Sequence, residues 1–154
     1  PRVEAAIFES HPAETLATGL GCERCDVSVL VGQATDDLLP LIHAVPPEGA
    51  AIIPANAAEL DRLVSTCRGH VVLYSLEGET PRLREHQARD GRVAFCLRDS
   101  LVLGTGPNAF FLSLKGLDAA TPAPREHLLP AVAAAWSVGV PVELLRDILG
   151  RTGL

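Results

Sequence analysis

Several residue types are scarce in this sequence of 154 residues, and their scarcity excludes whole classes of protein. Lys115 is the only lysine, the arginines are scattered, and the formal net charge is −6 with a pI of about 5.3. A nucleic-acid-binding surface needs a basic footprint for the phosphate backbone, so we expect no nucleic-acid partner. No apolar run is long enough to span a bilayer, and we expect no membrane partner.

The amino terminus also lacks two features. The basic-then-apolar pattern of a secretory signal is absent from Pro1 onward, which favours a cytoplasmic location. The chain has no methionine at all, so it is either processed or a piece of a longer polypeptide, and we expect the piece. With hydrophobic residues at 47% and charged residues at 21%, the composition is that of an ordinary globular protein. The length fits a single domain over residues 1–154.

The cysteine content indicates reduced thiols. The chain contains Cys22, Cys25, Cys67 and Cys96 without a secretory signal. Cys22 and Cys25 form a Cys-x-x-Cys pair, which is either redox-active, half of a zinc site, or structural. Cys67 and Cys96 come singly, and the pair leads into an expected strand rather than opening a helix. We therefore favour structural thiols.

The first half of the chain alternates strand and helix patterns. Short apolar runs predict buried strands at residues 3–8, 26–31, 49–53 and 70–75. Helices are predicted at residues 14–20, closed by Gly19 and Gly21, at 36–45, bent or shortened by Pro40, and at 57–67, with Asn56 as N-cap. Continuous rather than alternating apolar strands separated by helices indicate βαβ units, and hence a mainly parallel, Rossmann-like sheet over residues 1–76.

The second half, residues 77–154, has a different pattern. A tight hairpin at Arg98-Asp99 is predicted to join strands 92–97 and 100–103, and residues 110–114 to add a third antiparallel strand. A loop is expected at residues 118–124. Two closing helices follow at 127–138, ended by Gly139, and at 142–149, closed by Gly150. The predicted fold class is therefore α/β: a mainly parallel sheet, a β-hairpin or meander, and two C-terminal helices.

Three collinear segments carry a resemblance to a known family. The first runs from Glu9 to Gly19-Leu20-Gly21-Cys22 and Cys25-Asp26-Val27. The second joins Leu73-Tyr74-Ser75 to Pro81, Arg82, His86 and Gly91-Arg92-Val93. The third joins Ala131–Trp136 to Gly139-Val140-Pro141 and Ile148. Together they resemble the Mur-ligase-like domain of the cyanophycin synthetase type, within the Mur ligase superfamily, and the resemblance covers nearly the whole chain.

The resemblance implies ATP-dependent amide ligation in the parent family. There, ATP phosphorylates a carboxylate and an amine attacks the acyl phosphate. A glycine-rich loop with a lysine holds the triphosphate, carboxylates and a histidine hold Mg²⁺, and positive charge stabilises the transferred phosphoryl group. The resemblance also implies a fold that is part of a Mur ligase central domain.

Many polar positions of the family pattern are replaced in this sequence. No Gly-x-x-x-x-Gly-Lys-Ser/Thr loop occurs, and in the family it lies upstream of this segment. The family's Thr-Ala-Arg-Gly-Gly after the first strand reads Ser10-His11-Pro12-Ala13-Glu14. Its Asn-Ile-Gly-Glu-Asp-His reads Gly32-Gln33-Ala34-Thr35-Asp36-Asp37, and its Asn-Ala-Asp-Asp-Pro reads Pro54-Ala55-Asn56-Ala57-Ala58. Two family asparagines fall near Pro124 and His127.

Some acidic residues could preserve a vestigial metal site. Glu9 and Asp36 match family carboxylates, and Asp37 stands where the family has the histidine. At the carboxyl ends of neighbouring strands these three could bind Mg²⁺. The alternative is a solvated acidic rim, which we favour because no lysine or phosphate loop completes the site.

The remaining candidate motifs indicate local structure. The histidines show no Ser-His-Asp order and no His-x-x-x-His spacing, so we expect surface or locally bonded rings. They are His11, His43, His70, His86 and His127. Gly104-Thr105-Gly106-Pro107-Asn108 follows a hairpin strand and opens no helix, so it indicates a turn rather than a phosphate cradle.

Two functions from different classes follow. The first is a degenerate, noncatalytic domain with a structural, domain-packing or oligomerisation role, with no catalytic residues and no cofactor. Its partners would be a neighbouring catalytic domain of the same polypeptide or further copies of itself. The second is the downstream half of an active ATP-dependent amino-acid ligase, using ATP and Mg²⁺ with the phosphate loop supplied upstream. A weaker third reading is a binding module built on the Cys-x-x-Cys pair.

Overall fold

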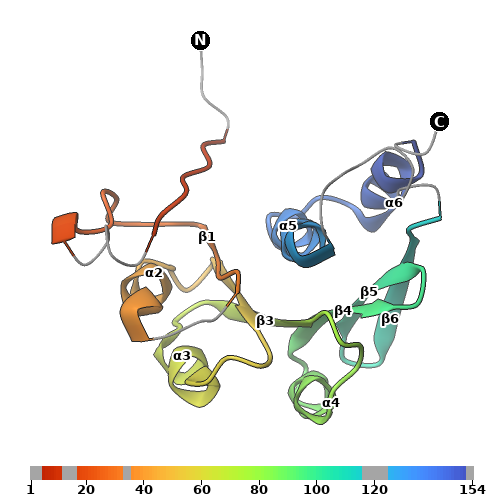
Figure 1. Cartoon of the computed structure of the whole chain (residues 1–154), viewed down its shortest axis with the longest axis horizontal. Helices are drawn as coiled ribbons and strands as arrows, with labels where there is room; N and C mark the ends of the chain where they lie inside the picture. The colour runs from red at the N-terminus through yellow and green to blue at the C-terminus, as the bar shows by residue number, and fades with distance from the viewer. Residues whose placement is uncertain (1–4, 12–16, 33–35, 116–124, 152–154) are drawn as a thin grey trace.

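The computed structural model describes residues 5–11, 17–32, 36–115 and 125–151 (Figure 1). Its strands are β1 (Val27–Val29), β2 (Ala50–Pro54), β3 (His70–Ser75), β4 (Arg92–Leu97), β5 (Ser100–Thr105) and β6 (Asn108–Ser113). Its helices are the 3₁₀ turn η1 (Asp36–Leu38), α2 (Leu39–His43), α3 (Leu60–Thr66), α4 (Pro81–Ala88), α5 (Arg125–Ser137) and α6 (Val142–Arg151). None of these described helices is long and apolar enough to cross a membrane.

The strands form a single mixed sheet in the order β1-β2-β3-β4-β5-β6. Neighbours from β1 to β4 run parallel, and β4-β5-β6 form an antiparallel meander. The predicted α/β class is therefore confirmed, with its mainly parallel first half, its meander and its two closing helices. β4 belongs to both halves, because it is parallel to β3 through α4 and antiparallel to β5.

The helices cover the two faces of the sheet in a regular way (Figure 1). The crossover helices α2, α3 and α4 lie on one face, while α5 and α6 pack on the opposite face. Each crossover from β1 to β4 moves one strand along the sheet in the same direction. Since such crossovers are right-handed, their helices must share one face, as they do here.

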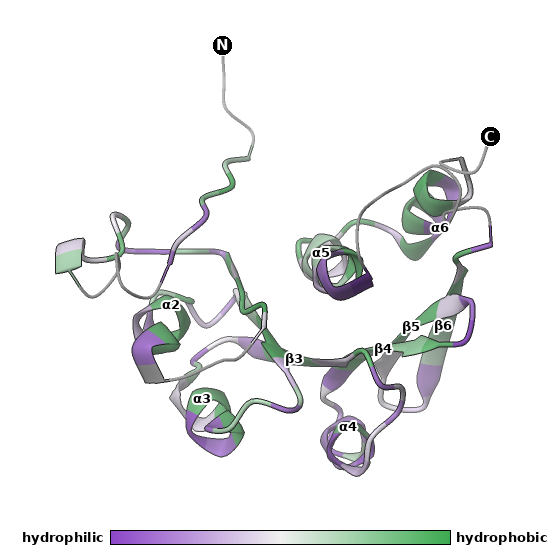
Figure 2. Ribbon diagram, in the orientation of Figure 1, coloured by the Kyte–Doolittle hydropathy of each residue, from purple (hydrophilic) through white to green (hydrophobic). Residues whose placement is uncertain are grey.

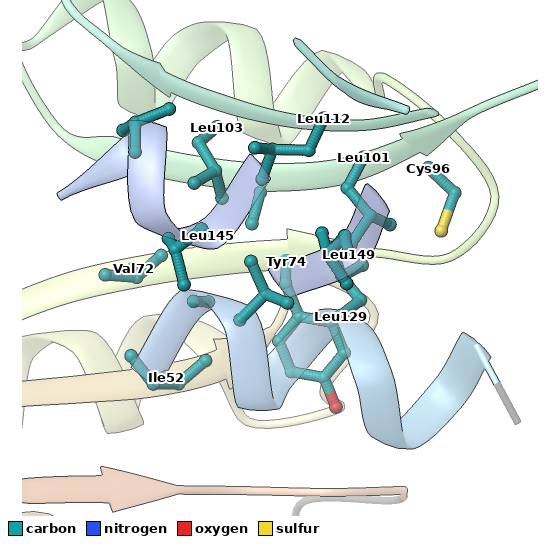
Figure 3. Packing of buried hydrophobic residues seen from close by; sticks show 14 of the residues in the cluster. Ile52, Val72, Tyr74, Cys96, Leu101, Leu103, Leu112, Leu129, Leu145 and Leu149 are labelled. Atoms are coloured by element: carbon teal, nitrogen blue, oxygen red, sulfur yellow. The ribbon is translucent and has the colours of Figure 1, made fainter. Parts of the chain in front are cut away.

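Two apolar cores lie on the two faces of the sheet. Figure 2 colours the ribbon by hydropathy, and Figure 3 shows residues of the core beneath α5 and α6. Alternate residues of β2 illustrate the division: Ile52 packs toward α5, whereas Ile53 packs toward α2 and α3, and both are fully buried. Leu129 of α5 and Leu63 of α3 fill the two cores and are also fully buried. Burial of β2 on both sides accounts for the continuous apolar pattern of its sequence.

Turn geometry supports several predicted boundaries. Arg98, at the β4–β5 hairpin, has a φ of 53°. Gly139, after α5, has a φ of 92°, the left-handed conformation that ends helices. Gly19 and Gly21 also have positive φ, at 81° and 71°. Of the helix predicted at 14–20, residues 14–16 lie outside the described residues, as does the loop predicted at 118–124.

The strand predicted at residues 3–8 is wrong within the described part of the segment. Residues 5–8 form no strand and pair with no neighbour, and the side chains of Ile7 and Phe8 are 99% and 83% exposed. The sheet begins with β1. An apolar run gives a strand only where a pairing edge and a covering layer meet it, and here the run meets neither.

Two helix predictions also need correction, and one helix was not predicted. Helix α3 begins at Leu60 with Glu59 at the N-cap and no side-chain cap, so Asn56 is not the cap. Helix α6 continues through Gly150 to Arg151, because glycine is tolerated near a helix end. Helix α4 was not predicted: Leu83 is its only buried residue, so it shows almost no apolar periodicity.

Ser28 of β1 is expected to be dispensable for stability. Its side chain is 2% exposed, and its hydroxyl has no hydrogen-bond partner among the described residues. Burying an unpaired hydroxyl costs about 1–3 kcal/mol, so Ser28→Ala should raise the free energy of unfolding by about 1 kcal/mol. Urea denaturation of both proteins measures this, and a loss of stability would show that the hydroxyl has a partner.

Candidate functional site

A cleft of about 720 Å³ lies where β1, β2 and β3 end. Val31 and Gly32 follow β1, residues 54–58 follow β2, and Tyr74 to Glu77 end β3. The start of α4 and the first turn of α5 complete its walls. Parallel α/β sheets bind ligands at the carboxyl ends of their strands, so this cleft is the candidate functional site.

Tyr74 connects two strands that form the wall of the cleft, β3 and β1. Its hydroxyl donates a hydrogen bond of 2.9 Å to the carbonyl of Leu30, linking β3 to the end of β1 (Figure 3 shows the ring in the core). Burial raises the pKa of Tyr74 to about 12, because the phenolate would lose its solvation. Tyr74 is therefore neutral at physiological pH and acts as a structural donor.

Two hydroxyl side chains at the cleft accept hydrogen bonds from backbone amides. Thr80 caps α4, accepting a hydrogen bond of 3.3 Å from the amide of Leu83, and Pro81 follows it in the first turn. Ser75 accepts a hydrogen bond of 3.2 Å from the amide of Glu77. Both hydroxyls shape the turn between β3 and α4.

The charged groups of the cleft are mostly acidic. Glu77 and Glu126 line it, against the single guanidinium of Arg82 among the described residues. Arg82 itself lies 3.9 Å from a carboxylate oxygen of Asp61, an exposed pair. His127 Nε2 lies 3.8 Å from a carboxylate oxygen of Glu126. The described lining contains no lysine, so its positive charge is small.

The structure describes the predicted metal-binding residues only in part. Glu9 lies in the unpaired segment with its side chain 85% exposed, and its carboxylate is 3.6 Å from His11 Nε2. Asp37 is exposed in η1. Asp36 begins η1, but its side chain lies outside the described residues. The described residues contain no group of three or more His, Cys, Asp or Glu able to hold a metal.

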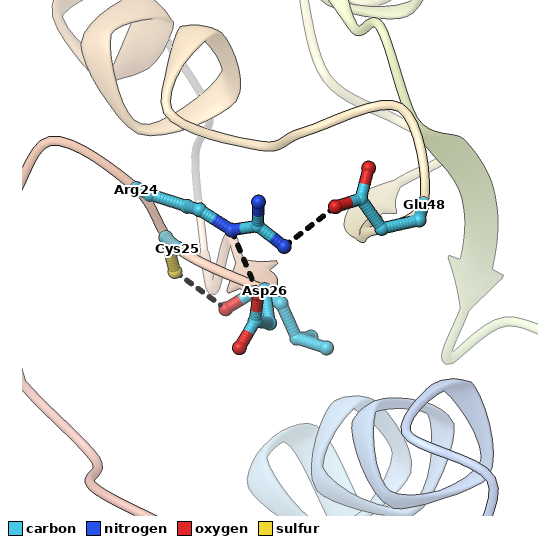
Figure 4. Close-up of polar contacts among 5 residues, drawn as sticks. Arg24, Cys25, Asp26 and Glu48 are labelled. Atoms are coloured by element: carbon cyan, nitrogen blue, oxygen red, sulfur yellow. Dashed lines mark hydrogen bonds and ion pairs between the residues drawn. The ribbon is translucent and has the colours of Figure 1, made fainter.

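The Cys-x-x-Cys pair is arranged as structural thiols. Cys22 is exposed, whereas Cys25 is partly buried and its thiol donates to the carbonyl of Val27 at 2.8 Å (Figure 4). Burial raises the pKa of the Cys25 thiol, with the nearby Cys22 adding to the effect. A raised pKa disfavours the thiolate that redox chemistry needs.

An exposed ion-pair cluster stands beside this pair, at the start of β1. Arg24 Nη2 lies 2.6 Å from a carboxylate oxygen of Glu48, and its Nε lies 3.3 Å from Asp26 (Figure 4). The pKa of Arg24 is raised, chiefly by hydrogen bonding to Glu48 and then to Asp26. The pKa of Glu48 is lowered, first by its own backbone amide and then by Arg24. The cluster joins β1 to the turn before β2.

Several positions of the replaced family pattern lie in the cleft. They are Gly32 after β1, residues 54–58 after β2, and His127 at the start of α5. Reasoning from sequence had placed altered family positions here but had not identified Tyr74, Ser75, Glu77 or Arg82 as cleft residues. Their place at the end of β3 was the available signal, because strand ends meet at one edge of the sheet.

Removing the Tyr74 hydroxyl should change the pH dependence of stability. The folded-state pKa of about 12 lies above the ordinary value of 10.0. Stability from the neutral phenol is thus complete below pH 10 and is lost as the pH rises toward 12, by about 3 kcal/mol at most. Tyr74→Phe should lose about 1 kcal/mol at neutral pH and lack this alkaline loss.

Denaturant titrations of the two proteins across that pH range measure the difference between them. Burial also raises the pKa of the Cys67 and Cys96 thiols. Both proteins contain these thiols, so their contribution to the alkaline loss of stability cancels in the comparison. Equal alkaline losses in both proteins would contradict the assignment to Tyr74.

Comparison with known proteins confirms the resemblance. No protein-family model matches the chain. The cyanophycin synthetase of Geminocystis herdmanii is 24% identical over 167 residues, covering 96% of this chain and 19% of that protein. Those of Crocosphaera subtropica and Synechocystis sp. are each 25% identical, over 112 and 109 residues, covering 61% of this chain and 12% of each protein. The chain is thus similar to one cyanophycin synthetase over almost its whole length and spans a fifth or less of the length of these relatives.

One solved structure has a similar arrangement over much of the chain. It is the UDP-N-acetylmuramoylalanyl-D-glutamyl-2,6-diaminopimelate--D-alanyl-D-alanyl ligase from Acinetobacter baumannii. The TM-score is 0.46 and the identity 19%, and the match covers 80% of this chain and 28% of that one.

Proposed function

We propose that this ligase-like domain is noncatalytic and has a structural role, in domain packing or oligomerisation within a larger assembly. The observation that carries the proposal is the composition of the cleft at the carboxyl ends of β1 to β3. Among the described residues of its lining, the charged side chains are two glutamates and one arginine, and there is one histidine. The remaining lining is mostly alanine, proline, valine, leucine and small polar groups.

Electrostatics weigh against a bound triphosphate in this cleft. A nucleotide's phosphates require several positive groups, supplied by lysine, arginine, metal ions or backbone amides. Glu77 and Glu126 would repel phosphate, and the one nearby guanidinium, Arg82, faces Asp61. The chain as a whole carries a formal net charge of −6. We therefore expect no ATP or Mg²⁺ cofactor.

The scaffold around the cleft supports a structural role. Both faces of the sheet carry well-buried apolar cores, and the helices that cover them are in place. The residues that such packing requires are present, while the polar family positions after β1 and β2 are replaced. The expected partners are a neighbouring catalytic domain of the same polypeptide or further copies of the chain.

The alternative function is the downstream half of an active ATP-dependent ligase. Its support is the similarity to a cyanophycin synthetase over 96% of the chain. It requires a phosphate-binding loop from residues outside this sequence, which contains no Gly-x-x-x-x-Gly-Lys-Ser/Thr motif. The positive charge of that loop would have to outweigh the negative charge of Glu77 and Glu126 in the cleft.

Nucleotide-dependent stability of the longest natural polypeptide that carries this chain distinguishes the two functions, because the ligase alternative takes its phosphate-binding loop from residues outside this sequence. A ligand present at a hundred times its Kd raises the free energy of unfolding by about 2.7 kcal/mol. We expect chemical denaturation to give the same free energy with millimolar ATP and Mg²⁺ as with Mg²⁺ alone. An ATP-dependent increase of that size would contradict the noncatalytic assignment and favour the ligase.

A further inference from the structure

We draw no further inference here: the strongest candidate, the shallow groove of about 290 Å³ between α4 and β6 that the exposed side chains of Leu97 and Phe111 line in part, is an open face of the sheet, and nothing in the structure shows what covers it.

Discussion

Gly69→Ala is expected to destabilise the protein by about 3 kcal/mol, the upper range of overpacking costs. Gly69 lies between α3 and β3, against the turn before β2. A Cβ atom there would stand 2.5 Å from the carbonyl oxygen of Gly49 and 2.6 Å from that of Pro46. These are backbone atoms, held by a bond of 2.9 Å from the His70 amide to Gly49 and another of 2.9 Å from the Gly49 amide to Pro46. To relieve the clash, the start of β3 must move away from the turn before β2, which disturbs the alignment of the two strands.

The matched control for this change is Gly150→Ala. Gly150 lies in α6, and a Cβ there would meet nothing within 4 Å. Because alanine is the better helix former, this variant should be more stable by about 0.5–1 kcal/mol. Thermal and urea unfolding measure both variants. Equal effects at the two positions would show that the turn before β2 yields easily.

Leu129→Ala is expected to cost about 3 kcal/mol of unfolding free energy. Leu129 is fully buried where α5 crosses the sheet, within the core that also contains Ile52 and Tyr74 (Figure 3). Truncation leaves a cavity that a helix fixed over several strands cannot close. The loss should also loosen the first turn of α5, where Glu126 and His127 line the cleft.

Urea denaturation measures this loss, with Leu144→Ala as the control. Leu144 is 49% exposed on α6 and should cost less than about 1 kcal/mol. Most domains have only about 5–15 kcal/mol of stability in total, so Leu129→Ala would use a large part of it. A cost equal to that of the control would contradict the packing of α5 on the sheet.

The elements that the sequence predicted well are those in which consecutive residues are apolar or the local backbone preference is strong. The runs that became β2 and β3 are apolar at nearly every position, because both faces of the inner sheet are covered. The hairpin at Arg98-Asp99 and the end of α5 at Gly139 follow from local backbone preferences. These features depend on few distant contacts.

The predictions that were wrong depend on distant partners. Residues 5–8 are as apolar as β2, yet no strand among the described residues pairs with them. Helix α4 shows the reverse case, since one buried leucine, Leu83, and the Thr80 cap are enough to position it beside β3 and β4. A Thr-Pro pair before a polar stretch was the local signal for that helix.

The candidate site was predictable in location but not in composition. The sequence identifies the altered family positions, and several of them, including Gly32, residues 54–58 and His127, line the cleft. The metal-site prediction for Glu9, Asp36 and Asp37 stays a prediction, with Glu9 and Asp37 both exposed. The acidic pair Glu77 and Glu126 comes from elements far apart in sequence, so only the fold places them in one cleft.

Residue-resolved NMR titration of the cleft tests the central claim most directly. The claim is that the ligase-like scaffold remains while its cleft no longer binds nucleotide. In the longest natural polypeptide that carries this chain, amide resonances of Ser75, Thr80 and His127 are recorded as ATP with Mg²⁺ is added to millimolar concentration, against Mg²⁺ alone. We predict no saturable shift at these residues. Saturable shifts confined to the cleft residues would contradict the claim and show that the domain binds the ligase's nucleotide.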